Sequence, residues 1–211
     1  MQWLEQHVQS GDVVYDIGAN VGTFTLIAAI ARGARVVAFE PGYANFARLC
    51  ENIFLNGCSD RVVPVPLPLS DVNGLVRFVY RSVEPGQSRH RMDVQPEKDG
   101  RRPADRHADQ AMCAIRLDDA RAHFTLPPPS HIKLDVDGAE LRVLRGAIDT
   151  LRLGTLRSVL IEVDGRLWTT VEALLTASGF HLQRKIPRKD APTYAVFARL
   201  APPRSASPVD S

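Results

Sequence analysis

The stretch VVYDIGANVG, residues 13–22, joins an apolar run to an acid and then to a turn that contains two glycines. Residues 23–31 follow as a mainly apolar segment. The pattern predicts a strand, a tight turn and a helix, with the free amide groups of the helix directed at whatever ligand occupies the turn. Glycine lets the backbone of such a turn approach a ligand where any Cβ would clash. We interpret this stretch as a site for a nucleotide-like cofactor.

The spacing of the turn indicates the kind of cofactor. A dinucleotide site has the pattern G-x-G-x-x-G, whereas here the pattern from Asp16 to Gly22 is D-x-G-x-N-x-G. The Asp16 carboxylate would repel a pyrophosphate, but it can pair with an ammonium group or accept from a hydroxyl. A second short apolar strand ends in Glu40-Pro41, and an acid at this position is the usual partner of ribose hydroxyls. The two acids fit a cofactor with a ribose, a positive charge and no phosphate.

Two sets of motifs resemble known enzymes. Residues 16–22 and 39–41 are similar to motifs of S-adenosylmethionine-dependent methyltransferases with a Rossmann-like fold. The block HIKLDVDGAE at residues 131–140, followed by VLRGA at 143–147, resembles the I-K-x-D-x-E-G-A-E…V-L-x-G-A block of FkbM-type methyltransferases. One departure is Asp137, where the family more often has Glu. The resemblance implies S-adenosyl-L-methionine as methyl donor and a hydroxyl acceptor on a sugar, a glycan or a natural product.

Strands and helices are expected to alternate along the chain, which is typical of a parallel sheet covered by helices on both faces. Together with the resemblance, this predicts an α/β, Rossmann-like class I methyltransferase fold with a mostly parallel seven-stranded sheet and an antiparallel C-terminal hairpin. Expected strands cover residues 13–16, 35–40, 61–66, 132–135, 158–163, 180–186 and 193–200. Prolines at 64, 66 and 68 require the third strand to be short or to lie at an edge. A supplementary strand at 75–81 is expected to pair with residues 111–116.

We expect one methyltransferase domain over residues 1–200. Residues 82–110 are polar and form an expected insertion loop, either a solvated loop or one that covers the acceptor site. Its basic residues suit an acidic or phosphorylated acceptor: Arg89, His90, Arg91, Arg101, Arg102 and Arg106. The Pro- and Ser-rich residues 201–211 are expected to be disordered.

Composition excludes several classes of protein. The net charge of +2 makes no case for nucleic acid as a partner. Three cysteines without a C-x-x-C pair argue against a disulfide framework or a zinc site and favour reduced thiols. We expect a cytoplasmic protein without a membrane span, whose partner is a small-molecule or glycan acceptor. The sequence does not determine the oligomeric state.

The candidate site residues are acids at expected strand ends, where ligands bind in open α/β sheets. Glu40, with Pro41, is expected to hold the ribose. Asp16 and the turn residues Gly18, Asn20 and Gly22 are expected to position the methionine part of the cofactor. Ser70-Asp71 resembles the adenine-contacting position of the fold. For each acid, the alternative is a solvated carboxylate that caps a helix.

Methyl transfer to a hydroxyl requires alignment and removal of a proton. Asp135 is the first candidate for the base and is also expected to lie beside the cofactor, and Glu162 and Lys133 complete the catalytic set. Lys133 has an alternative interpretation, in which a buried lysine pairs with an acid for structural reasons. Asp135, Asp137, Glu140 and Glu162 also leave open a divalent cation site, but metal dependence is not favoured and we assign no metal ligand.

Three other functions stay open at this stage. A nicotinamide-dependent oxidoreductase shares the fold, although Asn20 and Asp16 disfavour a pyrophosphate. A non-catalytic protein that keeps the cofactor fold is the second alternative. A nucleic-acid amine methyltransferase is the third, and it is disfavoured because Asp135-Val136-Asp137-Gly138 stands where an N-P-P-Y-like tetrapeptide would be.

Overall fold

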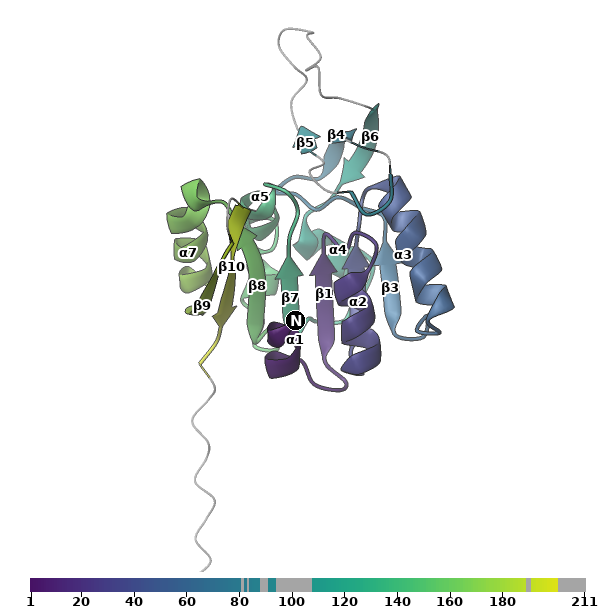
Figure 1. Ribbon diagram of the computed structural model, residues 1–211. Helices are drawn as coiled ribbons and strands as arrows, with labels where there is room; N and C mark the ends of the chain where they lie inside the picture. The colour runs from purple at the N-terminus through teal and green to yellow at the C-terminus, as the bar shows by residue number, and fades with distance from the viewer. Residues whose placement is uncertain (81, 83, 88–90, 94–107, 189–190, 201–211) are drawn as a thin grey trace, which may run out of the picture.

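A computed structural model describes residues 1–80, 82, 84–87, 91–93, 108–188 and 191–200. Its main sheet has seven strands in the order β3-β2-β1-β7-β8-β10-β9 (Figure 1). The strands are β1 (Val13–Ile17), β2 (Arg35–Phe39), β3 (Val62–Val65), β7 (His131–Leu134), β8 (Ser158–Val163), β9 (His181–Arg188) and β10 (Ala191–Ala198). Strands β3, β2, β1, β7 and β8 are parallel, and β10 runs antiparallel to both β8 and β9. The predicted fold class is confirmed, and β3 is both short and at the sheet edge, the two alternatives that its prolines left open.

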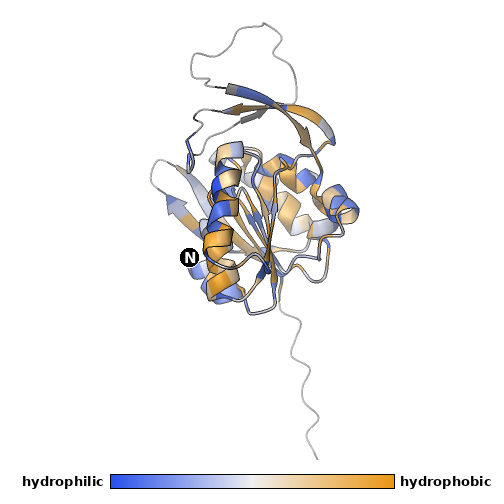
Figure 2. Ribbon diagram, turned by 90° about the vertical axis from the view of Figure 1, so that its right-hand side faces the viewer, coloured by the Kyte–Doolittle hydropathy of each residue, from blue (hydrophilic) through white to orange (hydrophobic). Residues whose placement is uncertain are grey.

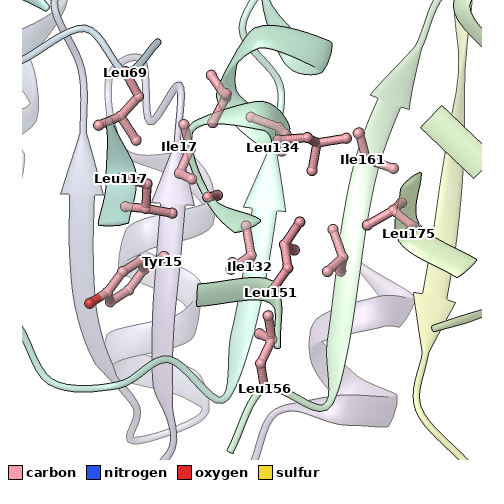
Figure 3. Close-up of a cluster of buried hydrophobic side chains, with 14 of the residues drawn as sticks. Tyr15, Ile17, Leu69, Leu117, Ile132, Leu134, Leu151, Leu156, Ile161 and Leu175 are labelled. Atoms are coloured by element: carbon pink, nitrogen blue, oxygen red, sulfur yellow. The ribbon is translucent and has the colours of Figure 1, made fainter. Parts of the chain in front are cut away.

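Strand alternation divides the apolar side chains between the two faces of the sheet. In β1, Val14 packs into a cluster with Trp3 and Leu49, whereas Tyr15 and Ile17 pack into the opposite cluster, part of which is shown in Figure 3. The first face is covered by α1 (Gln2–His7), α2 (Thr23–Leu26), the π-helix Ile27–Ala31 and α3 (Tyr43–Leu55). The second face is covered by α4 (Leu117–His123), α5 (Glu140–Arg145), α6 (Ile148–Leu151) and α7 (Trp168–Ala177), which the 3₁₀ turn Gly165–Leu167 precedes.

A second, three-stranded sheet stands over the edge at which β1 and β7 end (Figures 1 and 2). It has the antiparallel order β5-β4-β6, formed by β4 (Gly74–Tyr80), β5 (Arg91–Asp93) and β6 (Ala108–Ala114). The expected pairing is confirmed, with Val76 opposite Met112. The prediction of a loop over 82–110 is wrong at residues 91–93 and 108–110, because β4 satisfies its backbone hydrogen bonds through these distant segments. The basic residues expected to meet an acidic acceptor lie outside the described residues, apart from the backbone of Arg91, and so does the tail at 201–211.

Two short helices, α5 and α6, follow β7 and are separated at Gly146. A Cβ on Gly146 would lie 2.0 Å from the carbonyl oxygen of Ser70. The Gly146 carbonyl in turn accepts from the N–H of Asp118 at 3.0 Å. The two helices are separated here because this glycine packs its backbone directly against two other segments.

Gly18 directly follows β1 and lies against the backbone that leaves β7. Its φ is +79°, and an added Cβ would lie 1.8 Å from the carbonyl oxygen of Asp135, where the chain leaves β7. The N–H of Asp135 donates to the carbonyl of Ile17 at 3.1 Å, which holds the two segments together. This glycine is therefore already required by a contact between two parts of the protein backbone, before any ligand is considered.

We expect Gly18→Ala to lower the free energy of unfolding by about 2–4 kcal/mol, because it adds a backbone clash to an unfavourable φ. Gly11→Ala is the matched control, since Gly11 has φ +85° and no atom within 4 Å of its added Cβ. That control should cost about 1–2 kcal/mol. Urea unfolding measures both, and equal losses would show that the contact with Asp135 does not constrain the turn.

Candidate active site

The acids expected at strand ends lie along one edge of the main sheet. Asp16 is the fourth residue of β1 and Glu162 the fifth of β8, whereas Glu40 and Asp135 directly follow β2 and β7. Since β1, β2, β7 and β8 are parallel, these four positions are all near their carboxyl ends. The arrangement has two halves, one at the turn after β1 and the other beside β8 and β10.

Glu40 anchors the turn after β1. Its Oε2 accepts from the N–H of Asn20 and its Oε1 from the N–H of Gly42, both at 2.8 Å. Glu40 is only 5% exposed, and burial raises the pKa of its carboxyl although the two N–H groups oppose that shift. Asn20 itself has φ +52°, and its Oδ1 accepts from the N–H of Val21. The acid at the tip of β2 thus fixes the backbone of the predicted cofactor turn.

Gly22 also has a left-handed φ, +96°. Its added Cβ would lie 2.7 Å from Cδ1 of Leu49 on α3. This glycine lets α3 pack closely against the turn. Pro41 follows Glu40 directly and is half-buried.

Ser70 and Asp71, the expected adenine contacts, are linked to α5. The Arg142 guanidinium donates to Asp71 Oδ1 at 3.0 Å and to Ser70 Oγ at 2.9 Å. Burial acts to raise the pKa of Asp71, but the hydrogen bond and charge of Arg142 outweigh it and the pKa is lowered. Ser70 is fully buried, so Asp71 is the more accessible of the two for a ligand.

A buried charged cluster lies behind the turn. Lys133 Nζ donates to the carbonyl of Gly18 at 2.6 Å and lies 3.2 Å from Asp16 Oδ1. The other oxygen of Asp16 accepts from Thr25 Oγ1 at 2.7 Å. Asp16 is 1% exposed and Lys133 4% exposed. These contacts favour the structural interpretation of Lys133. They give Asp16 a hydrogen bond on Oδ2 and an ion pair on Oδ1, which has no hydrogen-bond partner of its own within the described residues.

The second half of the site surrounds Asp135. The Tyr194 hydroxyl donates to Asp135 Oδ2 at 2.6 Å, while Lys133 Nζ lies 3.9 Å from the same oxygen. Tyr194 pairs with Glu162 in the β8–β10 register. Glu162 Oε1 accepts from Arg188 at 2.6 Å, and the Arg188 guanidinium lies over the Tyr194 ring at 5.0 Å.

Electrostatics in this half are dominated by negative charge. Burial, followed by the charge of Asp135, raises the pKa of Glu162 to about 7, although Arg188 acts in the opposite direction. Burial and the hydrogen bond to Asp135 raise the pKa of Tyr194. Tyr194 therefore stays protonated as a donor, and Glu162 is able to exchange a proton near neutral pH.

The Glu140 side chain is hydrogen-bonded to the backbone of the turn that follows Asp135. Its Oε1 accepts from the N–H groups of Val136 and Gly138, each at 3.1 Å. Within the part of the chain that the structure describes, no three His, Cys, Asp or Glu residues come together as metal ligands. The cation site left open for Asp135, Asp137, Glu140 and Glu162 gains no support from this geometry.

Tyr194 and Arg188 are the site residues that sequence reasoning missed. They lie on β10 and β9, in the hairpin that was predicted only as a structural element. The nearest sequence signal is the expected hairpin itself, because an antiparallel β10 beside β8 brings its polar side chains next to Glu162.

The chain is similar in sequence to known methyltransferases. The family model of the methyltransferase FkbM domain matches residues 16–182. The chain belongs to the FkbM methyltransferase family. Curated relatives include the hexuronic acid methyltransferase AglP of Haloferax volcanii, 29% identical over 164 residues that cover 76% of this chain and 59% of the relative. The 31-O-demethyl-FK506 methyltransferase FkbM of Streptomyces tacrolimicus is 29% identical over 195 residues, covering 82% of this chain and 74% of the relative.

The fold of this FkbM-family chain is shared by solved structures. The methyltransferase FkbM of Methylobacillus flagellatus superimposes with a TM-score of 0.61 at 17% identity, covering 89% of this chain and 43% of that one. The FkbM-family chain thus spans less than two thirds of AglP and less than half of the Methylobacillus protein. None of its helices within the described residues is long and apolar enough to cross a membrane.

We expect Glu162 to make the stability of this FkbM-family chain depend on pH. Its folded-state pKa of about 7 lies above the ordinary 4.5, so the folded state binds the proton more tightly than the unfolded state. The stabilisation is complete below the ordinary pKa and is lost as the pH rises to the folded-state value. Relative to Glu162→Gln, the wild type should lose free energy of unfolding between these two pH values, as urea unfolding would measure. A difference that is constant with pH would contradict this.

Proposed function

We propose that this chain is an S-adenosyl-L-methionine-dependent O-methyltransferase whose acceptor is a hydroxyl on a sugar, a glycan or a natural product. Family membership over residues 16–182 supports methyl transfer. The names of two relatives, a hexuronic acid methyltransferase and a 31-O-demethyl-FK506 methyltransferase, support this class of acceptor. One observation carries the proposal. The Glu40-anchored turn follows β1 and the Asp135 carboxylate follows the neighbouring parallel strand β7, so the two lie next to each other.

The residues present fit the proposed donor. Glu40 is buried beneath the turn, and its oxygens retain lone pairs that can accept from ribose hydroxyls. Asp71 is a half-buried carboxylate held by Arg142 and is suited to accept from an exocyclic amine. Asp16, which contacts Lys133 and Thr25, would act on the donor through the shape of the Gly18–Gly22 turn.

S-adenosylmethionine, when bound, supplies a methyl group activated by a sulfonium charge. The chain then has to align the acceptor and remove its proton. Asp135 is the proposed base, and Tyr194 orients it by donating to one of its oxygens. Glu162, held by Arg188, is proposed to take up or relay the proton at neutral pH. Lys133 is proposed to maintain the geometry of both halves through Gly18 and Asp16.

The alternatives are not favoured. An oxidoreductase would bind a pyrophosphate at the turn, where Glu40 lies beneath Asn20. A scaffold without activity would not need the Asp135–Tyr194–Glu162 arrangement. Residues 1–200 are proposed as one methyltransferase domain.

We expect the wild-type chain to bind S-adenosylhomocysteine, and Glu40→Ala to weaken that binding by at least about tenfold through loss of charge-assisted hydrogen bonds. Isothermal calorimetry measures both affinities, with thermal unfolding used to check that the variant is folded. Glu51→Ala is the control, because Glu51 is an exposed carboxylate on α3 paired with Arg48. Equal affinities in wild type and Glu40→Ala would show that Glu40 does not hold the donor.

We expect Asp135→Asn to keep the affinity for S-adenosylhomocysteine while lowering turnover about 10²–10⁴-fold, the usual contribution of a general base. Tyr194→Phe should give a smaller loss of turnover, since it removes only the group that orients the base. Mass spectrometry of products from a panel of hexuronic acids, glycans and hydroxylated natural products, with and without a chelator, measures the transfer. Asp60→Asn, an exposed acid before β3 paired with Arg61, serves as control. Full activity of Asp135→Asn would exclude Asp135 as the base.

A further inference from the structure

Residues 84–87 lie between β4 and β5 of the inserted sheet and contact the main domain, and we call them the strap. The strap contains a turn in which the N–H of Gln87 donates to the carbonyl of Glu84 at 3.4 Å. Gly86 within it has φ +86°. All four residues are exposed, yet the backbone of the strap makes specific contacts with two asparagines near the predicted donor site.

Asn45 holds the strap at two adjacent points. Its Oδ1 accepts from the N–H of Gly86 at 2.8 Å, and its Nδ2 donates to the carbonyl of Gln87 at 3.1 Å. Asn45 is 3% exposed and lies in the first turn of α3. Asn45 also acts to lower the pKa of the neighbouring Glu40 carboxyl, which burial raises. One buried amide therefore holds the strap beside the acid that anchors the turn after β1.

Asn20 provides a third contact from the turn itself. Its Nδ2 donates to the same Gln87 carbonyl at 3.2 Å, while its backbone N–H donates to Glu40. The acid, the turn and the strap are thus linked in one hydrogen-bonded chain, from Glu40 through Asn20 to the Gln87 carbonyl, which Asn45 also binds. Such a network favours one arrangement of its members, because the donors in it are satisfied by one another.

The inserted sheet is anchored next to this hydrogen-bonded chain. The Tyr80 hydroxyl, at the end of β4, accepts from the N–H of Tyr43 at 3.3 Å and donates to Gln110 of β6 at 2.8 Å. The rings of Tyr43 and Tyr80 lie 5.1 Å apart. The sheet that carries the strap is thereby fastened to the same first turn of α3 as Asn45.

We infer that the strap is the roof of the donor site and that Asn45 is a further donor-site residue, which locks the strap across the turn. This rests on the proposed function, since it assigns a nucleoside-type donor to the space between the strap and the Glu40-anchored turn. Donor binding and closure of the strap are then coupled: bonds that hold the strap down strengthen donor binding, and loosening the strap speeds donor release.

Two variants loosen the strap by different means. Gly86→Ala places an L side chain at φ +86° with no atom within 4 Å of the added Cβ, so it strains the strap without a clash. Asn45→Ala removes both contacts of Asn45 with the strap. Gly11→Ala is the matched control for the first variant, because Gly11 has φ +85° and open space around the added Cβ but lies at the opposite end of β1.

The test measures S-adenosylhomocysteine affinity by calorimetry and amide hydrogen exchange of peptides that contain residues 84–87. We expect Gly86→Ala to weaken the affinity on the order of fivefold, because alanine is disfavoured in the left-handed backbone conformation that the closed strap requires. Asn45→Ala should weaken it on the order of tenfold, because two hydrogen bonds to the strap are lost. Both should raise exchange in the strap, and Gly11→Ala should change neither quantity. If Asn45→Ala fails to fold, the affinity and exchange of Gly86→Ala alone test whether the strap covers the donor.

Three results would overturn the assignment. Unchanged affinity in Gly86→Ala despite faster exchange would show that the strap does not cover the donor, and tighter binding would show that it obstructs the donor instead. Unchanged exchange would show that these contacts do not hold the strap. In each case wild-type binding leaves the proposed function intact, whereas absence of wild-type binding would remove both.

Discussion

The buried ammonium group of Lys133 is the interaction on which both halves of the site depend. It reaches from β7 to the carbonyl of Gly18 and to Asp16 on the neighbouring strand β1. A buried charge of this kind is tolerated only when it is paired and hydrogen-bonded, and removing a single partner typically costs about 3–5 kcal/mol. The same side chain lies near Asp135. Lys133 therefore contacts the turn and lies near the proposed base, and so helps to fix the position of one relative to the other.

The C-terminal hairpin contributes chemistry as well as a sheet edge. Because β10 is antiparallel and pairs directly with β8, Tyr194 lies opposite Glu162 and reaches Asp135 on the far side of β8. Arg188 arrives from β9 and partly neutralises Glu162. The result is a group of polar side chains drawn from four strands, in which burial and mutual repulsion bring one carboxyl close to its titration point at neutral pH.

The inserted sheet changes how the cofactor turn is understood. Such a turn is ordinarily considered as a strand, a loop and a helix, yet here Asn20 also contacts a segment more than sixty residues further along the chain. Asn45 holds that segment beside the turn through a side chain that is almost completely buried. In this family member the insertion between β3 and α4 is therefore hydrogen-bonded to the proposed donor half of the site.

The sequence by itself determined the alternation of strands and helices, the restriction of β3 to a short or an edge strand, the family, and the identity of the acids at the strand ends. These follow from local patterns, since apolar runs, prolines and glycine spacing act within a few residues. The tertiary structure alone decided that Gly18 and Gly146 must be glycines, because their backbones lie against the carbonyl groups of Asp135 and Ser70 respectively. It also decided that Lys133 donates to the carbonyl of Gly18. It also placed Tyr194 and Arg188 beside Asp135 and Glu162, and Asn45 against the strap. Each of these depends on contacts between segments far apart in the chain, and the periodicity of a single segment carries no information about which distant backbone or side chain it will meet.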